Sequence, residues 1–241
     1  EFRRVLFRSA GRETQPDLAH EIYRLSFSPG VARQDAGFKN FGELHFKFAL
    51  HDLMNNDLGY TRYQEINFPS ITLRYWGADQ SLRLEHLNLV GLYSLFPLNA
   101  LEAKFSWKGG LEISAPKDFG CHNCDVGRVG GGLGYAVEPF GEWMTSFLLA
   151  QTYLEVGSPL REGYRVLLGP EVGTIFNPLS FWKARFIATV NFDPLQKNRS
   201  PYTVKMGHDQ SWSFNPSFEL RAAYEKIWLS STHRAAYEEV K

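Results

Sequence analysis

The sequence predicts an all-β protein, namely a closed antiparallel up-and-down β-barrel of about 12 strands of the outer-membrane type. Three observations lead to this prediction. Apolar and polar residues alternate with a period of two along most of the chain, many alternating segments reach the roughly 9–11 residues with which a tilted strand crosses a bilayer, and no segment has a convincing helical period. A composition that is 15% aromatic also suits a β protein.

The clearest alternation is SFWKARFIATVNF, residues 180–192, in which Trp182 and Phe186 fall on one parity and Lys183 and Thr189 on the other. Such a strand has one apolar face and one polar face. In a soluble sandwich the apolar face points into a core, whereas in a transmembrane barrel it points outward into lipid. The direction of the apolar face therefore decides the class of protein.

About a dozen segments alternate in this way, and Gly-, Pro-, Asn- and Asp-rich turn signals separate them. Residues 77–80 predict a short hairpin turn, and Pro69 must occupy an edge, a bend or a bulge of its strand. Residues 207–213, GHDQSWS, are predicted to form a polar loop. The predicted strands are 20–27, 43–50, 66–76, 81–93, 101–114, 126–138, 143–156, 163–176, 180–192, 201–206, 217–228 and 232–240.

Charges on the polar faces and aromatic residues near the strand ends favour the membrane barrel, because an outer-membrane barrel has a polar interior and aromatic girdles. A solvent-exposed face of a soluble sheet would carry similar charges. A soluble β-barrel or sandwich that binds a small apolar ligand therefore stays open as an alternative. On the membrane hypothesis, the lipid-facing residues are Leu44, Phe46, Phe48, Leu50, Trp182, Phe186, Val190 and Phe192.

Lys plus Arg and Asp plus Glu both number 26, so the formal net charge is zero and no basic excess suggests a nucleic acid partner. The first nine residues, EFRRVLFRS, resemble translated sequencing-adapter sequence, and we treat residues 1–9 as an adapter-derived artefact of a metagenomic fragment. Residues 10–241 are predicted to form a single β-barrel domain that is truncated in its C-terminal strand.

Ordered motifs in residues 41–76, 82–99 and 105–114 carry a family resemblance. A strand runs into a His-Asp-Leu loop that ends in Asp-x-Gly-Tyr, and Arg-Leu-Glu and Ser-Trp-Lys elements follow. The residues concerned are His51, Asp52, Leu53, Asp57, Gly59 and Tyr60 in the loop, then Arg83, Leu84 and Glu85, and then Ser106, Trp107 and Lys108.

This arrangement resembles the C-terminal β-barrel-like domain of bacterial envelope proteins that carry an Lnb-type N-terminal periplasmic domain, an uncharacterised family. The resemblance covers about residues 20–192 and implies a location in the outer membrane of a Gram-negative bacterium. It also implies that the barrel anchors a periplasmic domain missing from this chain, to which the peptidase-like or hydrolase-like chemistry of the family belongs. Membrane lipid and that missing domain are the expected partners.

The loop residues His51, Asp52 and Asp57 could form a metal or acid/base cluster. The favoured interpretation is a turn in which Asp57 and Asn56 hydrogen bond their own backbone and Gly59 supplies a positive φ. Arg83 and Glu85 stand two residues apart on one strand face, and we expect them to form an interior ion pair.

His86 and Asn88 also share a face, and a Ser-His-Asn set on a barrel wall could make a lipid hydrolase, which stays open as a third function. No serine is singled out by spacing, so we expect no catalytic residue, no metal, no cofactor and no enzymatic activity. The glycines of residues 127–135 lack the Gly-Lys-Ser/Thr ending of a phosphate loop. They are predicted to mark positions where the sheet curls or a neighbouring aromatic side chain covers the backbone.

The two cysteines of the chain, Cys121 and Cys124, form the sequence CHNC. A zinc site would need further good ligands, and a redox pair would need a helix N-terminus, whereas Gly120, Asn123 and Asp125 indicate a loop. In an oxidising compartment such close thiols form a disulfide, so Cys121 and Cys124 are the disulfide candidate that pins the 115–126 connection.

Overall fold

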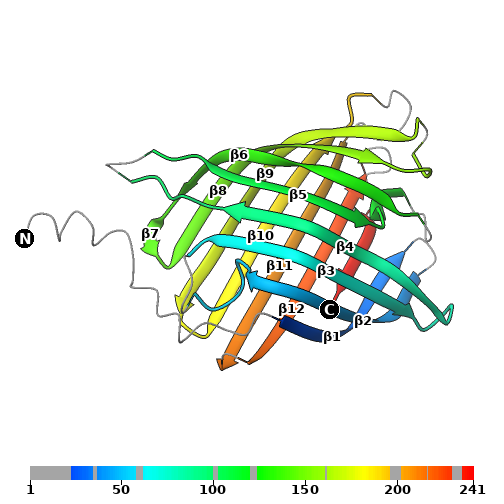
Figure 1. The fold of residues 1–241 in the computed structure, drawn as a ribbon, viewed down its shortest axis with the longest axis horizontal. Helices are drawn as coiled ribbons and strands as arrows, with labels where there is room; N and C mark the ends of the chain where they lie inside the picture. Colours follow the sequence, from blue (N-terminus) through cyan, green and yellow to red (C-terminus); the bar gives the residue numbers. More distant parts are fainter. Residues whose placement is uncertain are drawn as a thin grey trace, which may run out of the picture.

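The structure is a computed structural model, which describes residues 23–34, 37–57, 62–99, 103–119, 124–160, 162–195, 202–215, 217–229 and 235–241. Twelve antiparallel strands close into one barrel, which confirms the predicted fold class (Figure 1). The barrel strands are β1 (Tyr23–Gln34), β2 (Gly37–His51), β3 (Gln64–Trp76), β4 (Ser81–Ser94), β5 (Ser106–Ser114), β6 (Val126–Val137), β8 (Met144–Val156), β9 (Tyr164–Leu179), β10 (Trp182–Phe192), β11 (Tyr202–Asn215), β12 (Phe218–Leu229) and β13 (Ala235–Val240).

Strands adjacent in the chain are adjacent in the wall, and β1 closes the barrel against β13 through Val31, Ala32 and Arg33. Two short elements lie in connections: β7 (Pro139–Glu142) between β6 and β8, and the 3-10 turn η2 (Lys117–Phe119) between β5 and β6. No helix among the described residues is long and apolar enough to span a membrane.

The two faces of the wall differ in character, as β8 shows. Its residues Phe147, Gln151 and Glu155 are buried, whereas Leu148 and Leu154 on the other parity are exposed. Every barrel strand carries at least one exposed large hydrophobic residue. The buried set, in contrast, contains many full charges.

Polar contacts between strands that are not neighbours show which face of the wall is buried. Lys108 Nζ on β5 lies 2.6 Å from Glu171 Oε2 on β9, and Arg74 Nη1 on β3 donates to Tyr237 Oη on β13 at 2.9 Å. Such pairs can form only across the interior of the barrel. The apolar face therefore points outward and the polar face inward, which is the arrangement of an outer-membrane barrel and the reverse of a soluble barrel with an apolar interior.

Each predicted strand has a counterpart, but some of the predicted bounds are wrong. Residues 207–213, expected to form a polar loop, lie within β11. There the inward-facing Asp209 pairs with Arg185 on β10, while the outward-facing His208 and Gln210 are polar too, so no apolar parity was visible. Pro29 and Gly30 interrupt the alternation in β1. The sequence therefore did not predict its second half, which continues to Gln34.

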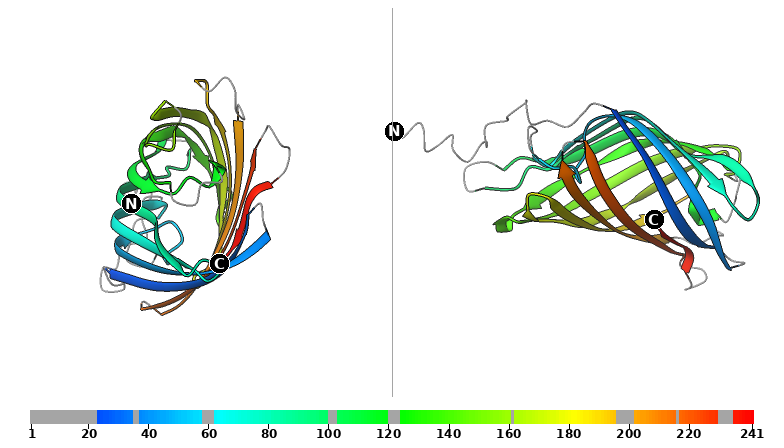
Figure 2. Two further views of the ribbon diagram at one scale, coloured as in Figure 1. Left: turned by 90° about the vertical axis from the view of Figure 1, so that its right-hand side faces the viewer. Right: turned by 90° about the horizontal axis from the view of Figure 1, so that it is seen from below.

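Glycines on β6, which were predicted to mark a curl of the sheet or a cover by an aromatic side chain, allow the backbone of the neighbouring strand to approach closely. A Cβ atom on Gly134 would lie 1.9 Å from the carbonyl oxygen of Leu148, and one on Gly130 would lie 2.1 Å from that of Thr152. Only a residue without a side chain fits at such distances. The end-on view shows the wall curling tightly where these green strands lie (Figure 2).

Candidate functional site: the polar lumen

The connection between β2 and β3 folds into the barrel, and we call its residues 52–57 the plug loop. Leu53, Met54 and Asn55 are buried. Basic residues on two strands of the wall bind the loop. Lys183 Nζ on β10 lies 2.6 Å from Asp57 Oδ1, and Arg221 Nη2 on β12 lies 2.9 Å from Asp52 Oδ2. Since β10 is five positions from β2 in the closed wall of twelve strands, the plug loop crosses the lumen.

The plug loop begins with a turn built on Asp52, whose Oδ1 accepts a hydrogen bond from the backbone N of Met54 at 2.9 Å. Within the described residues, the motif side chain that hydrogen bonds its own backbone is therefore that of Asp52. Asp57 binds Lys183 and Asn177, and its Oδ1 lies 3.7 Å from His51 Nε2. Gly59 and Tyr60 of the motif lie outside the described residues.

Electrostatics keep both plug-loop carboxylates ionised. Burial by itself would raise the pKa of Asp52, but Arg221, Lys47 and Arg24 outweigh it and hold this pKa well below its usual range. Burial likewise opposes ionisation of Asp57, and the contacts with His51 and Lys183 still lower its pKa. The ion pairs of the loop are therefore present at neutral pH.

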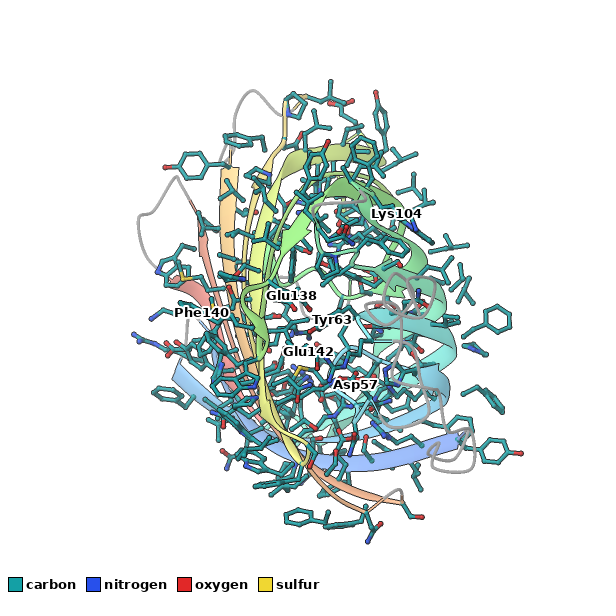
Figure 3. The ribbon with its side chains drawn as sticks, turned by 90° about the vertical axis from the view of Figure 1, so that its left-hand side faces the viewer. Asp57, Tyr63, Lys104, Glu138, Phe140 and Glu142 are labelled. Carbon is teal, nitrogen blue, oxygen red and sulfur yellow. The ribbon has the colours of Figure 1, made fainter. Side chains whose placement is uncertain are left out.

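An apolar cluster completes this end of the lumen. Leu53 of the plug loop and Tyr63 pack against the inward-facing residues Phe147, Leu149 and Ile175. Figure 3 looks into this mouth and shows Asp57, Tyr63 and Glu142 close to its centre. Arg62 Nη1 lies 2.7 Å from Glu142 Oε2 at the same rim.

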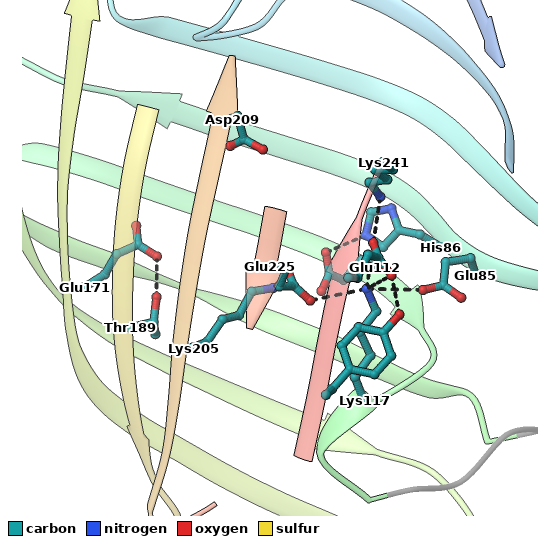
Figure 4. A network of polar contacts seen from close by, with 12 residues as sticks. Glu85, His86, Glu112, Lys117, Glu171, Thr189, Lys205, Asp209, Glu225 and Lys241 are labelled. Carbon is teal, nitrogen blue, oxygen red and sulfur yellow. Dashed lines mark hydrogen bonds and ion pairs between the residues drawn. The ribbon is translucent and has the colours of Figure 1, made fainter. Parts of the chain in front are cut away.

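A second insertion enters from the opposite end, because the β5–β6 connection lies at the other rim of an up-and-down barrel. Lys117 of η2 reaches the carboxylates of Glu225 at 3.2 Å, Glu239 at 3.3 Å and Glu85 at 3.4 Å (Figure 4). Asp118 beside it pairs with Arg165 at 2.7 Å. Burial would lower the pKa of Lys117, but the surrounding carboxylates raise it well above its usual value.

A buried charge network lies behind Lys117. The Arg74 side chain is 1% exposed, and its guanidinium contacts Glu43, Glu85 at 3.1 Å and Glu239 at 2.9 Å. A guanidinium is tolerated there only because carboxylates from β2, β4 and β13 surround it. Between the two insertions lies a cavity of about 1200 Å³, whose lining includes His45, Thr72, His86, Glu112 and Lys205.

Arg83 and Glu85, the expected interior pair, each have another ionic partner. Arg83 Nη2 lies 3.8 Å from Asp79 in the β3–β4 turn, whereas Glu85 contacts Arg74 and Lys117. The reason is a bulge. Leu73 pairs with Leu84 and Thr72 with His86, so Glu85 is an extra residue in β4.

Because of the bulge, the side chain of His86 reaches the lumen together with that of Glu85. His86 Nε2 lies 2.8 Å from Glu112 Oε2 on β5. The sequence analysis singled out His86 but not Glu112, since their pairing depends on the β4–β5 register. Among the described residues, no group of three or more His, Cys, Asp or Glu is arranged to hold a metal ion.

The sequence did not predict that Lys183 and Arg221 in the wall, and Lys117 in the second insertion, are partners of the motif residues. Their only signal in the sequence is a charge on the polar parity of a strand or in a turn. Of the cysteines, Cys121 lies outside the described residues, and Cys124 is disulfide-bonded.

The proposed lipid-facing residues are on the outer face where the structure describes them. Trp182 and Val190 are partly exposed. The side chain of Leu50 lies outside the described set. The clearly exposed members, at 36% to 48%, are Leu44, Phe46, Phe48, Phe186 and Phe192.

Fold and lumen together define an outer-membrane-type β-barrel of twelve strands whose interior is occupied by inserted loops. Residues 13–238 match a family model described as a domain of unknown function, DUF7840, and the chain belongs to this family. No curated protein matches the chain in sequence.

Two solved structures resemble the chain in shape. One comes from work on the mechanism of in-meso crystallization of membrane proteins, with 10% sequence identity and a TM-score of 0.38 over 90% of this chain and 81% of that chain. The other is a loop L8 deletion mutant of OmpT, an outer membrane protein of Vibrio cholerae, with 7% identity and a TM-score of 0.34 over 91% of this chain and 98% of that chain.

Proposed function

We propose that this chain is an integral outer-membrane domain of a Gram-negative envelope protein that serves as a membrane anchor and not as an open channel. Membrane lipid is its first partner. Its second is an Lnb-type periplasmic domain of the parent protein, a proposal that rests on the resemblance carried by residues 41–114. The barrel itself is assigned no catalytic role.

One observation carries the membrane assignment: exposed large hydrophobic residues occur on every strand around the barrel, while many charged residues of the same strands are buried inside. Val172 on β9 is 51% exposed, and its neighbour Glu171 is buried against Lys108. A water-soluble protein rarely exposes so continuous an apolar surface, whereas lipid covers it at no cost. The inserted loops support an anchor in preference to a pore.

The test compares one arginine on the outer face with one in the lumen. Val172→Arg places a charge near the middle of β9 on the apolar surface, and we expect it to destabilise the barrel in lipid by about 2–4 kcal/mol. Thr203→Arg, at a residue that lines the cavity, is the control and should cost much less. Both are refolded into lipid vesicles and unfolded in urea. Equal stability of the two variants, or failure of the wild-type barrel to float with the vesicles, would contradict the proposal.

A further inference from the structure

The wall of the barrel has a gap between β1 and β12, at the end where the plug loop lies. β13 fills only part of the space between these two strands. It pairs with β1 over residues 31–33 alone, and on its other side Lys241 forms the last backbone hydrogen bonds, with Ala223. Among the described residues, nothing pairs with this side of residues 23–29 of β1 and 218–222 of β12. We call the space between these two edges the wall slot.

The wall slot leads from the outer face of the barrel into the lumen. In the view from below in Figure 2, it lies between the dark orange β12 and the dark blue β1, beside the C-terminal end of the chain. Residues on both edges, 23–28 and 218–221, belong to the lining of the cavity of about 1200 Å³. On the lumen side of the slot, Arg24 Nη2 of β1 lies 3.3 Å from Glu219 Oε2 of β12.

The width of the wall slot is that of one strand. β1 and β12 both run antiparallel to β13, so they are parallel to each other. Neighbouring strands lie about 4.8 Å apart, which separates the two edges by about 10 Å where β13 lies between them. Unpaired backbone N–H and C=O groups are costly in lipid, and an acyl chain offers them neither donor nor acceptor. An extended polypeptide carries donors and acceptors on both of its edges, so it is the occupant that satisfies the slot.

We propose that the wall slot is the seat of one further length of antiparallel strand, which a segment of the parent protein supplies by continuing β13 in line. Val240 pairs with Val31 on one side and with Tyr224 on the other. When this register continues, the fourth residue after Val240 lies between Phe27 and Leu220. Both of these side chains are exposed on the outer face, so an apolar residue fits between them.

The next position along the segment faces the lumen. It lies between Ser26 and Glu219, which line the cavity, so a polar residue fits there. The wall slot therefore specifies about seven residues, the length of the open edge at 23–29, with the same alternation as the other strands. A filled slot closes the cavity toward the lipid, which agrees with an anchor.

This inference rests on the proposed membrane location, so the experiment first establishes that the barrel floats with lipid vesicles. The chain that ends at Lys241 is then compared with two variants that carry eight further residues of alternating valine and threonine. One extension begins with valine and the other with threonine. Their composition is the same, but a shift by one residue exchanges the lipid-facing and lumen-facing side chains.

Amide hydrogen exchange of residues 23–29 and 218–222 measures whether the wall slot is filled. We expect exchange that is about tenfold slower in the valine-first variant than in the chain that ends at Lys241, because the added strand pairs with both edges. Exchange in the threonine-first variant should be unchanged, since its valines would face the charged lumen.

Failure to float would count against the proposed membrane location. A floating barrel in which both extensions leave the exchange unchanged, or slow it equally, would overturn the inference. Slow exchange in the chain that ends at Lys241 would overturn it as well, because lipid or direct contact between β1 and β12 would then already close the slot.

Discussion

Asp52 shows how one residue of the sequence motif acquires its role from distant parts of the chain. It follows the last residue of β2 and forms a local turn with Met54, yet its charge is balanced by Lys47 on β2 and by Arg221 on β12. The first two contacts are local, but the third joins residues separated by 169 positions. A carboxylate at this place therefore fastens the plug loop to β12, which is three positions from β2 around the barrel.

Replacement of Asp52 by Asn should release the plug loop, because Arg221 and Lys47 lose their counter-charge in a buried setting. We expect a destabilisation of about 3 kcal/mol, at the low end for buried ion pairs since Arg221 is partly exposed. Amide hydrogen exchange of residues 52–57 measures the release. Asp79→Asn in the exposed β3–β4 turn is the control, and exchange that is equally slow in both variants would disprove the role of Asp52.

The pH dependence of the plug loop follows from the same residue. The pKa of Asp52 is lower in the folded protein than the unperturbed value of about 3.9, so its stabilising contribution is complete above that value and is lost as the pH falls through the folded pKa. Exchange protection of residues 52–57 should therefore stay constant between about pH 7 and pH 5 and decline only in strong acid. A decline already near pH 6 would point to another titrating group.

At the scale of one element, the close packing of β6 against its neighbour depends on glycines, because glycine has no Cβ atom. Gly134 faces the carbonyl of Leu148 so closely that a methyl group would meet backbone, which cannot rotate away as a flexible side chain could. Where no neighbouring atom is close, a glycine in a strand only raises the conformational entropy that is lost on folding. The sequence predicted a curl of the sheet or an aromatic cover at these glycines, whereas the close approach of the neighbouring backbone follows only from the β6–β8 register.

Gly134→Ala should consequently destabilise the barrel by about 1–3 kcal/mol, the cost of forcing atoms into a closely packed region. Gly207→Ala on β11 is the matched control, because the nearest atom to its added Cβ, the Tyr224 carbonyl oxygen, is 3.9 Å away. That substitution should be neutral or slightly stabilising. Urea unfolding in lipid vesicles, followed by tryptophan fluorescence, compares the two, and a Gly134→Ala variant as stable as Gly207→Ala would refute the close-approach argument.

At the scale of the whole molecule, the barrel has an insertion at each end of its lumen and a cavity between them. The plug loop and the apolar cluster occupy one mouth, and Lys117 with its carboxylates occupies the other. If the barrel is an anchor as proposed, passage of a solute requires both sets of ion pairs to separate.

Vesicles that contain the folded barrel should accordingly not swell in an iso-osmotic sugar solution. Light scattering of these vesicles is compared with that of protein-free vesicles and should be indistinguishable from it. Swelling at the rate of an open porin would show that the insertions leave a continuous aqueous path, and the anchor proposal would then have to include transport.

The sequence by itself determined the number and approximate position of the strands and the parity of their apolar faces, because alternation is a local property of an extended chain. It predicted hairpin turns such as residues 77–80 for the same reason. It could not locate β11 beyond residue 206, where both faces are polar.

Only the tertiary structure decided which face is inside, since the same alternation suits a sandwich and a barrel until the closing of β1 against β13 is known. It also decided the partners of the motif residues. Asp57 with Lys183 and Glu85 with Lys117 come from elements that are remote in the chain or displaced by a bulge. Their pairing is set by barrel closure and register, which no local pattern of residues encodes.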